Sequence, residues 1–215
     1  MPSITATTKT APAATRVDVW SDFVCPFCFI AEQSTVPRLL AEFELDLDWH
    51  GFELHPGTPR GGAPLSRLFP GVDLASLHAR TRRFGAGFGV ADFNPPDRVQ
   101  NSRRALGLAE YARDHGRLEA FRAAAFEAHW RQGKNLEADA DLRELASLAG
   151  LDDAAAIVAA DDPALLARVD RRQAEARTAG IGGIPTFIIG GEQVVGCQPY
   201  PVLVAAAERA RVRRR

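Results

Sequence analysis

The chain has 215 residues, a formal net charge of -1, 46% hydrophobic residues and 25% charged residues. This length suits one compact body with a sizeable insertion, and the near-neutral charge predicts no nucleic-acid binding. No run approaches the roughly 18 apolar residues that are needed to cross a bilayer, so we expect no membrane segment.

The first fifteen positions, residues 1–15, are rich in Thr, Ala and Pro and lack the apolar stretch of a secretory signal. We therefore expect a disordered tail over residues 1–15 and a cytoplasmic protein. In a reducing compartment, closely spaced cysteines act as a catalytic or redox-sensing pair rather than as a structural staple.

Residues 17–23 have the apolar pattern of a buried strand and run directly into Cys25-Pro26-Phe27-Cys28. Pro26 is typical of the first turn of a helix, because its missing N–H costs nothing there. We therefore place Cys25 at a helix N-terminus, where unpaired backbone amides and the helix dipole favour a thiolate. Cys28 lies on the same face one turn later, so the two sulfurs can form a disulfide.

A CxxC pair also occurs in zinc sites, which need further ligands at short spacing. The third cysteine, Cys197, is remote in the sequence, and the five histidines are scattered singly at His50, His55, His78, His115 and His129. The ligand count therefore favours a redox dithiol, and we expect neither a metal nor an organic cofactor.

After the dithiol, we expect one helix that runs to about Glu42. The alternating apolar and polar residues 45–54 then predict a second strand. A polar residue that alternates along a strand usually lies on its solvated face, and we interpret His50 in that way. Residues 56–70 are dense in Pro and Gly and predict an irregular connection.

Helical periodicity dominates residues 74–160, and Gly116, Gly133 and Gly150 fall where helix ends are expected. We interpret residues 61–160 as an inserted helical subdomain, flanked by residues 16–60 and 161–215 of the main core.

The last part of the chain returns to strands. Asp162-Pro163 predicts the start of a helix, and residues 185–189 and 193–195 predict a hairpin around Gly190-Gly191. Pro199 opens the last helix, and the basic residues 209–215 are interpreted as its solvated end.

Five segments carry a more specific pattern. They are Ser21-Asp22-Phe23-Val24-Cys25-Pro26-Phe27-Cys28, Phe52-Glu53-Leu54-His55-Pro56, Asn101-Ser102-Arg103-Arg104-Ala105-Leu106, Gly180-Ile181-Gly182-Gly183-Ile184-Pro185-Thr186-Phe187 and Gly196-Cys197-Gln198-Pro199. This set resembles the DsbA-type oxidoreductases of the FrnE-like branch. The resemblance implies an α/β thioredoxin-like fold with an inserted all-helical subdomain. It also implies thiol–disulfide exchange on protein or small thiol substrates, with glutathione as one candidate co-substrate.

The resemblance assigns roles to individual residues. Cys25 attacks and Cys28 resolves the mixed disulfide. Pro185 is expected to follow a cis peptide bond and to face the dithiol, and Ile184 is expected to offer its backbone to the substrate. A proline at this place also removes an N–H that would compete for the substrate or for the sulfurs.

Two residues depart from the family pattern, which more often has Trp at the position of Phe27 and no cysteine at that of Cys197. Pro26 and Phe27 are expected to contact the substrate and help to set the redox potential, so the direction of electron flow stays open. Cys197 is expected at the active-site edge. It is either a small apolar filler or an auxiliary thiol that exchanges with Cys25.

Two other functions stay open at this point. Relatives that isomerise hydroxychromene carboxylates or conjugate glutathione usually carry Ser at the position of Cys25, so the two cysteines argue against them. A binding protein whose groove holds a partner is the third alternative. Reduction of insulin disulfides that depends on Cys25 separates these alternatives, whereas the sequence predicts no particular oligomeric state.

Overall fold

The computed structural model describes residues 14–215. The predicted tail over residues 1–15 therefore lies almost wholly outside the described residues. Thr15 contradicts that prediction, because it begins the first strand. Within the described part, no helix combines the length and the apolar character that a bilayer-spanning segment needs.

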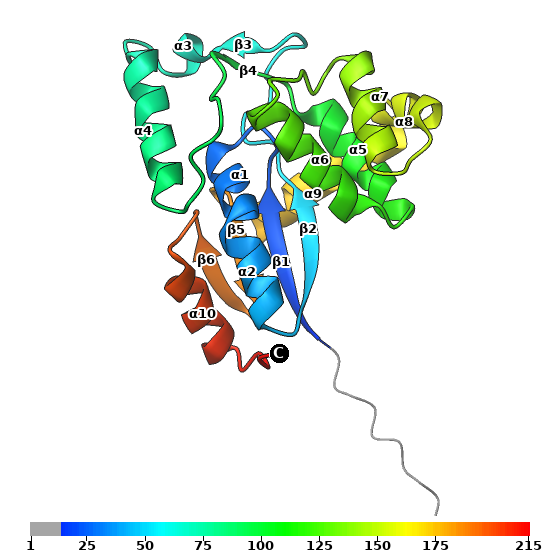
Figure 1. Cartoon of the computed structure of the whole chain (residues 1–215). Coiled ribbons are helices and arrows are strands. Elements are labelled where there is room, and N and C mark those ends of the chain that lie inside the picture. Colours follow the sequence, from blue (N-terminus) through cyan, green and yellow to red (C-terminus); the bar gives the residue numbers. More distant parts are fainter. Residues whose placement is uncertain (1–13) are drawn as a thin grey trace, which may run out of the picture.

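A mixed four-stranded sheet lies at the centre of the molecule, in the order β2-β1-β5-β6 (Figure 1). β1 (Thr15–Ser21) is parallel to β2 (Leu45–Gly51) and antiparallel to β5 (Thr186–Ile189). β5 forms the predicted hairpin with β6 (Glu192–Val195), and both turn glycines, Gly190-Gly191, have positive φ angles. This topology agrees with the predicted α/β fold.

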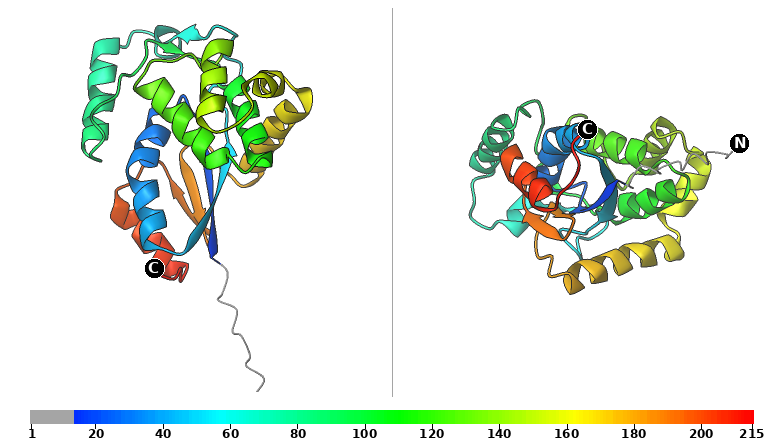
Figure 2. Two further views of the ribbon diagram at one scale, coloured as in Figure 1. Left: turned by 45° about the vertical axis from the view of Figure 1, so that its right-hand side comes forward. Right: turned by 90° about the horizontal axis from the view of Figure 1, so that it is seen from below.

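Helices cover both faces of the sheet. α1 (Pro26–Gln33), α2 (Thr35–Glu42) and α10 (Tyr200–Arg209) lie on one face, and α9 (Pro163–Thr178) lies on the other (Figure 2). α9 starts as predicted, because the Asp162 carboxylate accepts a hydrogen bond of 2.8 Å from the backbone amide two residues later.

The prediction of one helix from the dithiol to Glu42 is wrong, because Ser34 separates α1 from α2. Ser34 has a φ of -127° and a ψ of -72°, and its hydroxyl donates to the Ile30 carbonyl at 2.5 Å. Pro37 has no N–H with which to continue the helical hydrogen bonds across this position. The dithiol helix is therefore only 8 residues long.

β2 ends three residues earlier than predicted. The amides of Glu53 and Leu54 donate to side chains, Gln173 Oε1 at 3.0 Å and Asp22 Oδ2 at 2.8 Å, instead of to a neighbouring strand. The chain thus leaves the sheet at the level of the dithiol and is held there by side-chain acceptors.

The segment between β2 and α9 contains six helices, a small antiparallel ladder and the loops that join them. Its elements are β3 (Ala63–Pro64), α3 (Leu65–Leu68), α4 (Leu74–Ala86), β4 (Arg98–Val99), α5 (Arg103–Asp114), α6 (Leu118–Trp130), α7 (Asp139–Leu148) and α8 (Asp153–Ala160). Residues 63–68, which we expected to be irregular, form β3 and α3. Gly116, Gly133 and Gly150 follow α5, α6 and α7 with φ angles of 65°, 67° and 73°, as predicted.

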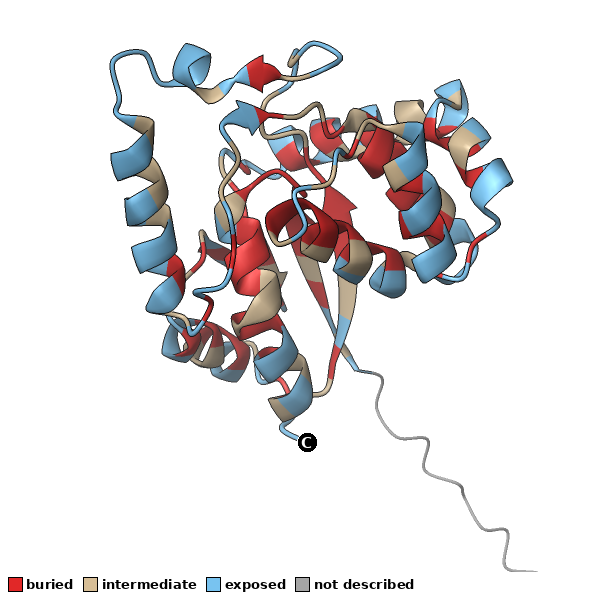
Figure 3. Ribbon diagram, turned by 45° about the horizontal axis from the view of Figure 1, so that its top comes forward, coloured by how far each residue is buried: buried red, intermediate tan, exposed pale blue. Residues whose placement is uncertain are grey.

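The buried side chains of the sheet and of the inserted helices form one continuous hydrophobic cluster. Figure 3 shows these buried residues on the strands and on the helices packed over them, with exposed residues on the outer helix faces. The predicted boundaries at residues 60/61 and 160/161 stay a prediction.

We had expected the basic C-terminal residues to form a solvated helix end, and this prediction is wrong. α10 ends at Arg209, and the chain then pairs with the turn between α2 and β2. The amide of Glu44 donates to the carbonyl of Arg213 at 2.8 Å, and the side chains of these two residues form an ion pair. Arg214 pairs with Glu42. These contacts fasten the end of the chain beside the sheet.

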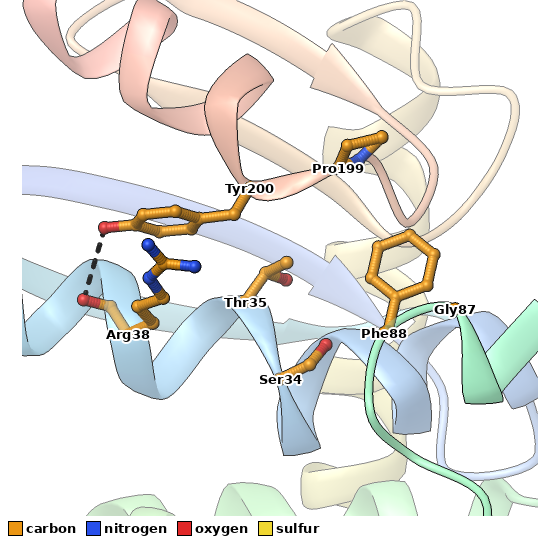
Figure 4. A pocket seen from close by; sticks show the side chains of 7 residues that line it. All are labelled: Ser34, Thr35, Arg38, Gly87, Phe88, Pro199 and Tyr200. Carbon is orange, nitrogen blue, oxygen red and sulfur yellow. Dashed lines mark hydrogen bonds between the residues drawn. The ribbon is translucent and has the colours of Figure 1, made fainter.

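A pocket of about 380 Å³ lies where α10 meets the junction of α1 and α2 (Figure 4). The Arg38 guanidinium lies over the Tyr200 ring, 3.8 Å from its centroid, and Phe88 closes the opposite side. No lining residue is a cysteine. This pocket therefore arises from the packing of α10 against α2 and is separate from the cysteines.

Gly85 fixes how α4 closes against the loop that follows it. A Cβ atom there would lie 2.4 Å from the Val90 carbonyl oxygen and 2.7 Å from the Phe93 ring. We expect Gly85→Ala to lower the free energy of unfolding by about 2 kcal/mol, because such overpacking forces the backbone to shift. Urea denaturation measures the change. Gly182→Ala is the matched control, since nothing lies within 4 Å of its added Cβ.

Candidate active site

Cys25 lies at the N-cap of α1 with Pro26 in the first turn, as predicted. Its carbonyl accepts the amide of Phe29 at 3.1 Å, while its sulfur lies 3.8 Å from the Ile184 carbonyl oxygen. The thiol is only 1% exposed. The sulfur therefore lies at the positive end of the α1 dipole with little competing water.

Cys28 lies one turn further along α1, with its thiol in hydrogen-bonding contact with Cys25. Burial raises the pKa of the Cys28 thiol well above its ordinary value, and the neighbouring Cys25 raises it further. Hydrogen bonds from Ser21 and the Asp22 backbone act in the opposite direction without reversing this shift. The Cys28 thiol is therefore protonated near neutral pH.

The loop that precedes β5 completes the site. The Ile184-Pro185 peptide bond is cis, as predicted, and the Ile184 carbonyl faces the Cys25 sulfur. The Pro185 carbonyl accepts the amide of Gly196 at 2.7 Å, which continues the pairing of β5 and β6 to the dithiol. The structure thus brings Cys25, Cys28, Ile184 and Pro185 together.

Cys197 follows this pairing and is buried at the active-site edge, where we expected it. Burial raises the pKa of its thiol to about 12, and the charge of nearby Cys25 contributes. The role of Cys197 stays a prediction, and this pKa favours the apolar filler over the auxiliary thiol.

We expect Cys197 to react with iodoacetamide at least about a hundredfold more slowly than Cys25 at pH 7, because only the thiolate is nucleophilic. Mass spectrometry of timed samples measures both rates. The auxiliary role makes the opposite prediction, which is a Cys25–Cys197 link or a modified Cys197 after peroxide treatment.

Asp22 is a site residue that the sequence did not single out. It is fully buried, and its carboxylate accepts hydrogen bonds from Leu54 N at 2.8 Å, Ser102 Oγ at 3.1 Å and Val24 N at 3.4 Å. Burial raises the pKa of this carboxyl to about 7, although these hydrogen bonds lower it. Three of the five resemblance segments therefore converge on one acid. An acid between a buried strand and a CxxC was the available signal.

His50 is not on a solvated face, which corrects our prediction. The side chain is buried and stacks on Trp20 at 4.5 Å, and its Nε2 lies 2.7 Å from Asp18 Oδ1. Asp18, Asp48 and His50 lie close enough together to be compared with a metal site. However, Arg16 pairs with both carboxylates, at 2.6 and 2.8 Å. The two carboxylates already have Arg16 as their counter-ion, and the cluster serves as a half-buried polar network.

A cavity of about 360 Å³ opens beside the dithiol, between the core and the inserted helices. Cys25 and Ile184 form one wall, and Leu77 of α4 and Trp130 of α6 contribute to the others. Phe27 lines the cavity as well, is 41% exposed, and packs edge-to-face on Phe84 at 5.1 Å. The predicted contact residue Phe27 therefore joins the CxxC turn to α4.

Residues 16–208 match the model of the DSBA-like thioredoxin domain. The chain belongs to this family. The DsbA-like fold is also shared with a "probable DsbA oxidoreductase" from Streptomyces coelicolor, with 27% identity, a TM-score of 0.81, and coverage of 91% of this chain and 89% of that one.

Two more distant structures share the fold of this DsbA-like protein. A 2-hydroxychromene-2-carboxylate isomerase has 21% identity and a TM-score of 0.73, over 90% of this chain and 95% of that one. The cytosolic disulfide reductase DsbM of Pseudomonas aeruginosa has 19% identity and a TM-score of 0.62, over 91% and 95%. At these identities the likeness concerns the fold alone.

Proposed function

We propose that this DsbA-like protein is a thiol–disulfide oxidoreductase in which Cys25 is the attacking thiol and Cys28 the resolving one. The observation that carries the proposal is the asymmetry of the pair. Cys25 lies at the helix N-terminus, whereas burial and the neighbouring sulfur hold the pKa of Cys28 high. The two thiols are thus prepared for different steps.

In the reducing direction, the Cys25 thiolate attacks one sulfur of a substrate disulfide. A Cys25–substrate disulfide forms, the substrate S–S bond breaks, and the other sulfur leaves as a thiolate. Cys28 then loses its proton and attacks Cys25 Sγ. The Cys25–Cys28 disulfide forms, and the second substrate sulfur leaves and takes up a proton. The same steps in reverse oxidise a substrate dithiol.

Ile184 and Pro185 are proposed to hold the substrate during these steps. The Ile184 carbonyl already accepts a hydrogen bond from the Cys25 thiol at 3.8 Å, so it lies beside the reacting sulfur. Pro185 has no N–H that could bond to either sulfur or to the substrate. Pro26 and Phe27 complete this contact surface beside the dithiol.

The finer parts of the proposal are the FrnE-like branch, a cytoplasmic location and glutathione as a co-substrate. The five motif segments support the branch. DsbM, described as a cytosolic disulfide reductase and also solved with GSH, supports the other two by likeness of fold. Protein disulfides and small disulfides are both within the proposed substrate class.

Reduction of insulin by the protein with dithiothreitol as electron donor tests the proposal, together with the reduction potential of the Cys25–Cys28 pair in glutathione buffers. Insulin turnover that rises and falls with the reduced fraction of the Cys25–Cys28 pair supports the proposed function. The fold is also that of a hydroxychromene carboxylate isomerase, and the apolar cavity suits a small molecule. Isomerisation that continues in Cys25→Ser, without reduction of either insulin or a small disulfide by the wild type, would favour this second candidate.

A further inference from the structure

We infer that the substrate of Cys25 is a small, largely apolar disulfide with a neutral hydrogen-bonding group, which binds in the cavity between the dithiol and α4. This inference rests on the proposed exchange function and narrows its substrate class. It is carried by the shape of the approach to the sulfur and by unpaired polar atoms in the cavity wall.

The approach to the sulfur is through the cavity. Cys25 is only 1% exposed and forms part of the cavity wall, so a disulfide must enter the cavity to reach Sγ. The volume of about 360 Å³ suits a small ligand and lies at the lower end of ligand pockets. The lining is mainly apolar and includes the side chains of Leu65, Phe69, Leu77, Trp130 and Ile184.

The lining of this cavity also includes two histidines with ring nitrogens that lack hydrogen-bond partners in the described part of the chain. His129 is 2% exposed, and neither of its ring nitrogens makes a well-formed hydrogen bond with the described residues. His78 Nε2 is also buried and makes no hydrogen bond with the described residues. A buried polar atom without a partner costs about 1–3 kcal/mol, so a ligand group that bonds to these atoms recovers part of that cost.

The charge of the lining selects against polar ionic disulfides. Burial lowers the pKa of His129 to about 4, despite a contact with the Lys134 backbone, so the ring is neutral and offers one donor and one acceptor. The one arginine of the wall, Arg98, already donates to the carbonyls of Gly61 and Gly62 at 2.9 and 3.1 Å. Glutathione disulfide, with its carboxylates and ammonium groups, finds few partners here, so the lining argues against the glutathione co-substrate that likeness of fold suggested.

Two disulfides of different polarity test whether the cavity prefers an apolar substrate to a charged one. Dithiodipyridine is small, aromatic and neutral, with a hydrogen-bond acceptor on each ring, and glutathione disulfide is the charged comparison. Each rate with the reduced protein is divided by the rate of free dithiothreitol with the same disulfide, which removes their different chemical reactivity. We expect this ratio to be at least about tenfold higher for dithiodipyridine, as burial of one aromatic ring would give.

Thr81→Trp tests whether the cavity causes the preference. Thr81 lines the cavity from α4, and its hydroxyl donates to the Leu77 carbonyl at 2.9 Å. Filling the apolar side of the cavity should lower the ratio for dithiodipyridine about tenfold more than the ratio for glutathione disulfide, because only dithiodipyridine gains from the apolar lining. Thr178→Trp is the matched control, because the exposed Thr178 makes the same kind of bond, to Ala174 at 3.1 Å, on α9. It should change neither ratio.

A binding measurement covers the case in which Thr81→Trp does not fold. In Cys25→Ser, calorimetry compares thiodiphenol, which carries hydroxyl groups, with diphenyl sulfide, which has none. We expect tighter binding of thiodiphenol, and loss of this preference in Cys25→Ser/His129→Phe.

The outcomes distinguish the inference from the function on which it rests. Equal ratios for the two disulfides, or an equal loss of both in Thr81→Trp, would overturn the apolar substrate while leaving exchange intact. Equal binding of thiodiphenol and diphenyl sulfide would also overturn it. If neither disulfide reacts faster with the protein than with free dithiothreitol while insulin is still reduced, the inference fails and the proposed function stands. If insulin is not reduced either, the proposed function itself fails.

Discussion

Cys25→Ser is expected to reduce disulfide exchange to the uncatalysed rate, whereas Cys28→Ser is expected to accumulate mixed disulfides with its substrate. Only Cys25 lies at the helix N-terminus, and Ser in its place cannot form the substrate disulfide. Without Cys28, the first step still occurs but no thiol follows to resolve the product. Reduction of insulin and of dithiodipyridine measures the first effect, and mass spectrometry under non-reducing conditions measures the second.

Circular dichroism of both variants shows whether they fold, so that loss of activity is not loss of structure. Alkylation of each single-cysteine variant near neutral pH provides the check on the assignment. Equal rates for the Cys25 and Cys28 thiols, or mixed disulfides that accumulate on Cys28 in Cys25→Ser, would reverse the proposed order.

Asp22→Asn is expected to change the pH dependence of stability. The pKa of Asp22 rises from 3.8 in the unfolded chain to about 7 in the folded protein, chiefly through burial. The folded state therefore holds a proton that the unfolded state has lost, and stability falls as the pH rises from about 4 to about 7. A shift of this size corresponds to about 4 kcal/mol. The Asn variant does not ionise and should keep this stability at pH 8.5.

The measurement is urea denaturation at pH 5 and pH 8.5 in a Cys25→Ala/Cys28→Ala background, which removes the titration of the dithiol. Asp22→Asn should resemble its parent at pH 5 and exceed it at pH 8.5. Asp92→Asn is the control without pH dependence. Arg131 lowers the pKa of the exposed Asp92, so this carboxyl is ionised in the folded and unfolded states at both pH values, and its loss should change stability equally at pH 5 and pH 8.5. A variant at Asp22 that is equally destabilised at both pH values would show that the carboxyl is ionised in the folded protein at pH 5 as well.

The parts of the fold that the sequence predicted are those with local causes. The strand pattern before Cys25, the Asp162 cap of α9 and the hairpin at Gly190-Gly191 each follow from a few neighbouring residues. The break at Ser34 also has a local signal in Pro37, which the apolar periodicity of the segment concealed. The cis bond before Pro185 was implied by resemblance and not by the residues themselves.

The features that could not be predicted arise from packing between distant segments. His50 is buried because α9, far along the chain, covers the face of β2 on which it lies. Alternation along a strand cannot show whether its polar face meets water or another helix. The cavity likewise depends on how α4 and α6 are placed over the dithiol. No spacing in the sequence encodes that arrangement.

The two halves of the reactive centre are also made at different times. Cys25 and Ile184 meet across 159 positions of sequence, and β5, which follows Ile184, lies between β1 and β6 inside the sheet. During synthesis the thiols therefore leave the ribosome long before the strand that must be inserted beside them. A nascent chain carries both sulfurs without the surface that presents them to a substrate. The complete reactive centre is assembled only after translation has delivered the last hairpin.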